Sequence, residues 1–124
     1  MIKLLPHKYL PEYETSIYVD GSVKIIGNMN KFVDVYCSDK DKSVFIRKHP
    51  LRTCSYDEAD ACIKLKKDTA ENIKQQMERY KEEGFPKKYG LTENNIIYRK
   101  HHNIYCVKLM EKWADEVRKG SHRD

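Results

Sequence analysis

Apolar residues follow two different spacings along this 124-residue chain, and the alternation between them predicts mixed helices and strands. Three short runs rich in Ile, Val, Phe and Tyr predict strands at residues 16–19, 43–47 and 95–99. The first run ends at Asp20-Gly21, a turn signal, after which residues 23–26 are expected to resume an extended conformation. An acidic residue therefore stands at the end of a predicted strand.

Apolar residues spaced three or four apart predict the helices. We expect short helices at residues 3–10 and 28–36, and longer ones at residues 56–67, from about 69 to 83, and after His102. Ser55 and Glu58, three residues apart, fit a capping box at the start of the third of these helices.

The fourth predicted helix has the clearest boundaries. Asp68 or Thr69 caps its start, and Gly84 is placed to end it in a left-handed conformation that lets Tyr80 touch Phe85. Pro86 then prevents the helix from continuing.

The last helix is expected to bury one stripe and to leave Glu116 on its solvent-exposed side. The residues of the stripe are Ile104, Val107, Met110, Trp113 or Ala114, and Val117.

Composition indicates one folded domain, because 124 residues with 40% hydrophobic content suffice for a single modest core. No run of apolar residues approaches the length needed to cross a bilayer. The four cysteines are widely spaced without a C-x-x-C pair, so we expect reduced, buried thiols and a cytoplasmic location. The net charge of +5 comes from lysines and acids that alternate, which argues against a nucleic-acid partner.

Several stretches, in this order, resemble an uncharacterised glycosyltransferase-like family of plants, bacteria and viruses that is related at fold level to the GT-A transferases. The matching stretches are KLLPHKYL, SIYVDGSVKI, KHPLRTCSYDEADACIKLKKD and QQMERYKEEGFPKKYGLTENNIIYRKH, followed by W-x-x-E at Trp113 to Glu116 and SHRD at Ser121 to Asp124. They cover nearly the whole chain.

The resemblance implies an α/β fold, with a partial GT-A-like mixed sheet flanked by helices. Family members usually carry further N-terminal strands that hold the nucleotide, so the chain is expected to be the central and C-terminal part of such a domain, or a reduced relative. The implied function is transfer of a sugar from a nucleotide-sugar donor to a glycan or other acceptor.

The resemblance also assigns chemistry to particular residues. Asp20 in Asp20-Gly21-Ser22 occupies the position of the D-x-D motif that binds Mn or Mg in GT-A transferases, although only the first acid is present. A β-turn explains the same residues without a metal. A divalent cation is therefore the implied cofactor, with Asp20 as its ligand.

The substrate is expected to meet the chain after the second strand. His49 and Arg52 are suited to bind phosphate or sugar hydroxyls through charge-assisted hydrogen bonds, with Tyr56 and Arg99 as further substrate-binding residues. Glu58 is explained equally well by its helix cap. We expect Asp20 and the His49-Pro50-Leu51-Arg52 turn to face the same hollow.

Two acids are assigned to catalysis. Glu93 lies in the loop that approaches the acceptor in GT-A relatives, and Asp124 lies near the position of their catalytic carboxylate. A solvated loop position explains Glu93 without a catalytic role. The adjacent His101 and His102 are not expected to share one metal ion, because neighbouring residues in a strand point to opposite faces.

A second hypothesis is a non-catalytic binding or assembly module that retains the transferase core. It predicts a homodimer formed through a sheet edge that the missing strands would leave exposed.

Overall fold

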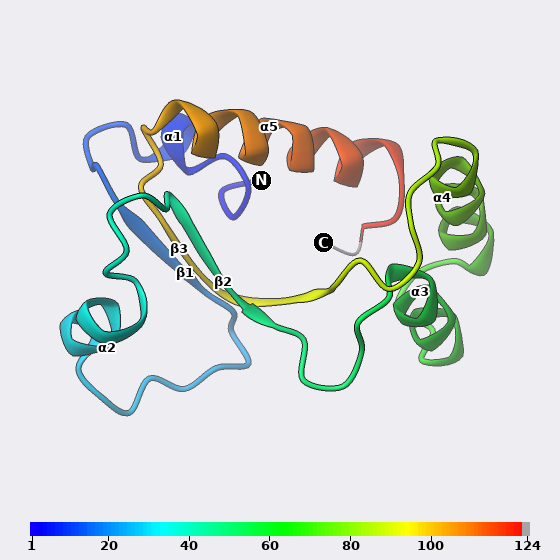
Figure 1. The fold of residues 1–124 in the computed structure, drawn as a ribbon, viewed down its shortest axis with the longest axis horizontal. Helices are drawn as coiled ribbons and strands as arrows, with labels where there is room; N and C mark the ends of the chain where they lie inside the picture. The colour runs from blue at the N-terminus through cyan, green and yellow to red at the C-terminus, as the bar shows by residue number, and fades with distance from the viewer. Residues whose placement is uncertain (123–124) are drawn as a thin grey trace. The chain divides into compact units, whose positions relative to one another are not determined.

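The structure is a computed structural model that describes residues 1–122. Within these residues, five helices and three strands follow one another, and the third and fourth helices are consecutive (Figure 1). They form two compact units, one of residues 1–47 with 94–112, and one of residues 48–93 with the described residues from Trp113 onward. We call these the first unit and the second unit, and the α/β class expected from the sequence is confirmed.

Three strands form one sheet in the order β1-β3-β2. Their bounds are Ser16–Val19 for β1, Val44–Lys48 for β2 and Thr92–Arg99 for β3. β1 pairs antiparallel with β3, and its register places Ser16 opposite Arg99. On the other side of β3, Lys100 N–H donates to the Ser43 carbonyl at 2.9 Å and His49 N–H to the Leu91 carbonyl at 2.9 Å, so β2 is also antiparallel to β3.

The extended stretch expected at residues 23–26 does not pair as a strand. Val23 N–H instead donates to the Asp20 carbonyl at 2.9 Å, which closes a turn, and the side chain of Ile26 is 90% exposed. No strand within the described part of the chain pairs with this stretch, as a β-ladder would require.

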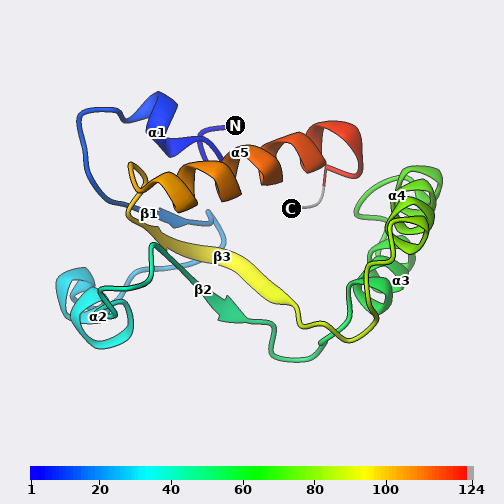
Figure 2. The same cartoon turned by 45° about the horizontal axis from the view of Figure 1, so that its top comes forward.

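Two helices lie side by side in the first unit, α1 (Pro6–Tyr9) and the start of α5 (Ile104–Lys119), as both views show (Figures 1 and 2). His7 Nε2 lies 3.3 Å from Glu111 Oε1 across this contact. The apolar side chains buried in this unit include Leu4, Leu5, Ile97, Cys106 and Met110. The helix α2 (Met29–Tyr36) follows an Asn28 cap and buries no residue fully.

The start of α5 differs from the predicted stripe. Asn103 Oδ1 accepts the backbone N–H of Tyr105 at 2.9 Å, so the helix begins with Ile104 turned outward and 62% exposed. Cys106 takes the buried position instead, and Met110 and Ala114 follow it at intervals of four residues. Met110 and Ala114 are confirmed, and Ile104 is wrong.

The second unit contains a pair of contacting helices, α3 (Ser55–Lys64) and α4 (Ala70–Glu82). Ala59, Cys62 and Ile73 form their buried core, with Ile63 and Met77 packed against it. Burying side chains of this kind contributes roughly 1 to 3 kcal/mol each.

The boundaries of α4 agree with the sequence pattern. Thr69 caps the start by accepting the Asn72 N–H at 3.3 Å. Gly84 has a left-handed φ of 77°, Phe85 N–H donates to the Tyr80 carbonyl at 2.8 Å, and the rings of Tyr80 and Phe85 lie 5.7 Å apart. The predicted glycine cap is confirmed.

The expected capping box of α3 is wrong. Cys54 is the N-cap residue, no described side chain caps the helix, and Ser55 is its first residue. The helix also ends at Lys64 instead of near Lys67, because Lys66 adopts a left-handed φ of 53°.

All four cysteines are buried and none forms a disulfide within residues 1–122, as expected. Among residues 1–122, no helix combines the length and the apolar character that a membrane span requires.

Candidate functional site

The His49 side chain closes the turn that follows β2. Its Nδ1 accepts the backbone N–H groups of Leu51 at 3.2 Å and Arg52 at 3.0 Å. Because Nδ1 acts as an acceptor, the neutral ring carries its proton on Nε2. His49 therefore fixes the turn that is expected to bind substrate through Nδ1, and its Nε2–H remains a hydrogen-bond donor.

Glu58, on the first turn of α3, brings the two predicted substrate-binding residues together. Arg52 Nε donates to Glu58 Oε2, and His49 Nε2 lies 3.9 Å from the same oxygen. Cys62 Sγ donates to the other oxygen at 3.5 Å. We call His49, Arg52 and Glu58 the Glu58 cluster.

The charges in the Glu58 cluster keep the carboxylate ionised. Burial would raise the pKa of Glu58, but the hydrogen bonds from Arg52 and Cys62 and the positive charge of Arg52 outweigh it and lower that pKa. The side chains of Arg52 and Glu58 are 29% and 23% exposed, so the pair is accessible from solvent. Arg52 uses Nε for Glu58, and its two Nη groups donate to no described residue. Those groups are the donors that a bound anion would meet.

The segment before β3 lies beside this turn. His49 N–H bonds to Leu91, and Gly90 N–H donates to the Thr53 carbonyl at 2.9 Å. Gly90 has a φ of 107°, which only glycine adopts without strain. Glu93, two residues after Leu91, is half-buried at the start of β3. The expected loop position of Glu93 is wrong, because β3 begins at Thr92, and it is the loop before β3 that lies next to the His49 turn.

Tyr56 has a structural contact of its own. Its hydroxyl donates to the Phe85 carbonyl at 2.9 Å, which ties the start of α3 to the chain after α4. The ammonium group of Lys81 lies 5.6 Å from the centre of its ring.

Asp20 and Arg99 belong to the first unit. Asp20 follows β1, its N–H donates to the Asn95 carbonyl at 2.8 Å, and Ser22 Oγ donates to its carboxylate at 3.4 Å. One carboxylate and one hydroxyl are a sparse ligand set for a hard cation, and residues 1–122 contain no group of three potential metal ligands. The shared hollow of Asp20 and the His49 turn stays a prediction.

Arg99 is 2% exposed, and its guanidinium donates to the Lys3 carbonyl. Its Nε is buried and has no hydrogen-bond partner among residues 1–122, and burial lowers the pKa of Arg99. The structure thus places this predicted substrate-binding residue in the interior of the first unit. Asp124, the other predicted catalytic acid, lies outside the described residues.

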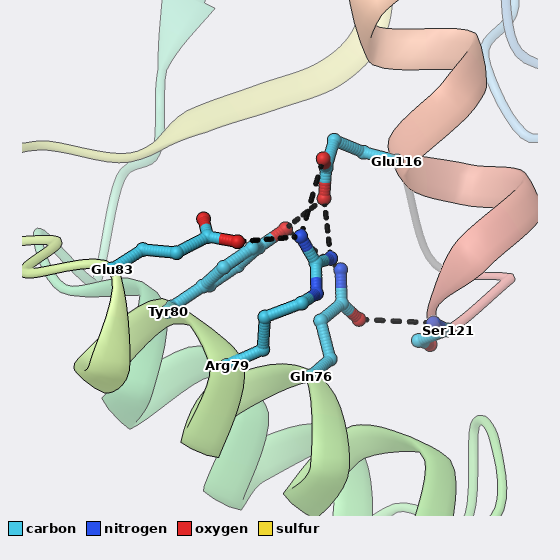
Figure 3. Close-up of polar contacts among 6 residues, drawn as sticks. All are labelled: Gln76, Arg79, Tyr80, Glu83, Glu116 and Ser121. Atoms are coloured by element: carbon cyan, nitrogen blue, oxygen red, sulfur yellow. Dashed lines mark hydrogen bonds and ion pairs between the residues drawn. The ribbon is translucent and has the colours of Figure 1, made fainter.

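A second polar cluster joins α4 to the end of α5 (Figure 3). Arg79 donates to both carboxylate oxygens of Glu116, at 3.3 and 2.5 Å, and the Tyr80 hydroxyl donates to Glu116 at 3.2 Å. The hydrogen bond from Arg79 is the main cause of a lowered Glu116 pKa, and the same bond raises the pKa of Arg79. The expected solvent-exposed position of Glu116 is wrong, because α4 packs there.

The whole chain, residues 1–124, matches the family model described as TOD1/MUCI70, glycosyltransferase-like domain. The chain belongs to this family. No curated protein and no solved structure is a significant match. The glycosyltransferase-like kinship inferred from the motifs is therefore confirmed.

In this TOD1/MUCI70 domain, Asp68 and Gln76 hold Ser121 and His122, a role that the sequence pattern did not predict for either residue. Ser121 Oγ and His122 N–H both donate to Asp68 Oδ2 at 2.7 Å, and Ser121 N–H donates to Gln76 Oε1 at 2.9 Å. The Ser121 bond is the main cause that lowers the pKa of Asp68 to about 2. Asp68 was expected only as a helix cap.

Gly120 makes room for this contact. A Cβ atom at Gly120 would lie 2.6 Å from Gln76 Cδ. Gln76 has little freedom to move away, since its Nε2 also donates to the Tyr80 hydroxyl at 2.8 Å.

Proposed function

We propose that this domain takes part in the transfer of a sugar from a nucleotide-sugar donor to a hydroxyl of a glycan or other acceptor. The family supports the class of reaction, and the observation that carries the proposal is the Glu58 cluster. It presents the Nη donors of Arg52 and the Nε2 proton of His49 on a turn fixed by hydrogen bonds. Such preorganised donors suit a diphosphate or sugar hydroxyls.

In the proposed reaction the bond between the sugar C1 and the diphosphate breaks, and a bond from C1 to the acceptor oxygen forms. The acceptor proton leaves to a carboxylate, for which the family resemblance offers Asp124. Arg52 and His49 bind the donor, and Glu93 binds acceptor hydroxyls from the start of β3. A divalent cation held in part by Asp20 would neutralise charge on the leaving diphosphate.

Glu58 has a positioning role in this proposal. Its ionised carboxylate accepts a hydrogen bond from Arg52 Nε and so fixes the plane of the guanidinium group. The two Nη groups then have a fixed orientation for binding the donor. Arg52→Lys would keep the positive charge, but a single ammonium group could not bind Glu58 on one side and the donor on the other in the same way.

The test is nucleoside-diphosphate binding followed by turnover. Uridine and guanosine diphosphate with MnCl2 are titrated by calorimetry, and release of the diphosphate from the matching nucleotide sugars is then measured. We expect Arg52→Ala to weaken binding about tenfold, equivalent to about 1.4 kcal/mol. Arg118→Ala serves as the control, because Arg118 is an exposed cation of the same unit that pairs only with Asp115 among the described residues. Absence of binding by every diphosphate would contradict the proposal.

The assembly-module alternative rests on the sparse ligand set at Asp20, where a hydroxyl stands in place of a second acid. It predicts no diphosphate binding and a homodimer in solution. Light scattering during size-exclusion chromatography measures the molar mass in solution. A dimer mass without diphosphate binding would favour the assembly module, and diphosphate binding would favour sugar transfer.

A further inference from the structure

A cavity of about 360 Å³ lies between α3 and α4 in the second unit, apart from the Glu58 cluster. Its volume is within the range of small-molecule pockets, roughly 300 to 1,000 Å³. Apolar side chains line it along both helices, from Ala59 and Ile63 on α3 and from Ile73 and Met77 on α4. Ala59 and Ile73 belong to the buried core of the helix pair, whereas Ile63 and Met77 are half-buried, so these two side chains supply the apolar surface that a hydrocarbon chain or ring would contact.

Lysines gather where this cavity meets the start of α3. Lys81, Lys87 and Lys88 line it together with Cys54, the N-cap residue of α3. Lys81 lies over the ring of Tyr56, and the amide of Lys88 lies close to the Cys54 thiol, so both belong to this end. Lys87 and Lys88 form no ion pair with any described residue.

The backbone adds to the positive character of this end. No side-chain hydrogen bond from residues 1–122 caps α3, and the first-turn amide of Asp57 faces the Cys54 thiol, so the partial positive charge of the helix start lies at this end. Carboxylates also line the cavity, at Asp57, Asp60 and Glu78, but four lysines outnumber them, with Lys74 as the fourth. A ligand with one anionic end would be oriented by this arrangement.

Cys54 supplies a chemical reporter within the cavity. Its side chain lines the cavity, although the residue as a whole is only 3% exposed. The backbone amides of Lys88 and Asp57 lower the pKa of its thiol, which increases the thiolate fraction available for alkylation. Burial has the opposite effect on Cys37 and Cys106, whose thiol pKa values it raises.

We propose that the cavity between α3 and α4 binds an amphipathic anion, with the acidic headgroup at Lys87 and Lys88 and the apolar part against Ile63, Ile73 and Met77. A phosphate or carboxylate attached to a short alkyl chain is the chemical class that fits both ends. The site does not depend on the sugar-transfer proposal, because it uses none of the residues of the Glu58 cluster.

The test measures how fast iodoacetamide alkylates Cys54, by peptide mass spectrometry, with octyl phosphate as the probe. Alkylation forms a bond from sulfur to the acetamide carbon and releases iodide. At about four times its dissociation constant, octyl phosphate should slow alkylation of Cys54 about fivefold. Inorganic phosphate lacks the chain and octyl glucoside lacks the charge, so each alone should slow it less than about twofold at the same concentration.

A double variant, Lys87→Gln with Lys88→Asn, removes both charges, and asparagine tolerates the left-handed φ of 55° at position 88. Protection of Cys54 should fall to the level seen with octyl glucoside. Lys24→Gln with Lys31→Gln is the matched control in the first unit and should leave protection unchanged. Shifts of the Met77 and Lys88 amide signals on titration provide a readout independent of the thiol.

Three results would overturn the proposal. Octyl glucoside protecting as well as octyl phosphate would show that charge plays no part. Protection that persists in the double variant would place the ligand elsewhere. A Cys54 that no probe protects, with unshifted Met77 and Lys88 amides, would show that the cavity does not bind this class of ligand.

Discussion

The Ser121 hydroxyl donates a 2.7 Å hydrogen bond to the carboxylate of Asp68, a residue 53 positions earlier in the chain. The backbone N–H of His122 donates to the same oxygen at 2.7 Å. The ionised form of Asp68 therefore holds the segment that leads to the predicted catalytic acid Asp124. Protonation of that carboxylate would weaken both bonds.

Asp68 should make the stability of the protein depend on acid pH. Its pKa falls from an ordinary 3.8 to about 2 in the folded state, so its stabilising contribution is present above about pH 4 and is lost as the pH falls towards 2. Asp68→Asn should lower the free energy of unfolding at pH 7 and reduce the loss of stability between about pH 4 and pH 2, which we call the acid limb. Urea unfolding between pH 2 and 7 measures both, with the exposed Asp34→Asn on α2 as the control. An unchanged acid limb in Asp68→Asn would contradict the assignment.

Arg79 and Glu116 should be energetically coupled. Both side chains are about one-third exposed, at 32% and 30%, and two parallel hydrogen bonds join them. A double-mutant cycle with Arg79→Met and Glu116→Gln should give a coupling of about 1 to 2 kcal/mol. The more exposed pair of Arg118 and Asp115 should give less than about 0.5 kcal/mol in a parallel cycle. Equal couplings in the two cycles would count against the bidentate pair.

His49 should be replaceable by asparagine in its turn but not by alanine. An Asn side-chain oxygen can accept the Arg52 N–H in place of Nδ1, whereas His49→Ala leaves that donor unsatisfied and should cost about 1 kcal/mol. Hydrogen exchange of the Arg52 amide should accelerate in His49→Ala and remain slow in His49→Asn. If the two variants exchange alike, the turn does not depend on the ring nitrogen.

Gly84→Ala should destabilise the protein by about 1 kcal/mol, because the residue has a left-handed φ of 77°. No atom lies within 4 Å of the added methyl group, so conformational strain alone causes the loss. Gly21→Ala also meets open space, and its φ is not left-handed. Thermal unfolding of the two variants should therefore differ, and a Gly21→Ala as damaging as Gly84→Ala would refute this explanation.

The parts of the fold that the sequence predicted depend on neighbouring residues. The Thr69 cap, the Gly84 stop and the strand at Ser16–Val19 are each encoded within a few positions, and all three are confirmed. The capping box was wrong because the Glu58 carboxylate could accept a hydrogen bond either from a backbone N–H at the start of α3 or from Arg52. The guanidinium of Arg52 offers it a charge-assisted hydrogen bond, which is stronger than a neutral bond to a helix N–H.

The candidate site was only partly predictable. His49 and Arg52 were expected together because both follow a predicted strand within a stretch that resembles the family, and the structure places both at Glu58. The bond between Arg79 and Glu116 spans 37 positions, and no local pattern encodes such a contact. Arg99 illustrates the reverse case, since its position in a strand does not reveal that β3 lies in the middle of the sheet.

The contact between Gly120 and Gln76 should limit which substitutions either position can accept while the other is unchanged. A methyl group at position 120 would collide with the amide of Gln76, which is held from both ends. A shorter side chain at position 76 removes that collision before any residue larger than glycine arrives at position 120. We therefore expect a larger residue at position 120 to be tolerated when position 76 has changed first, and to be selected against when Gln76 is still present.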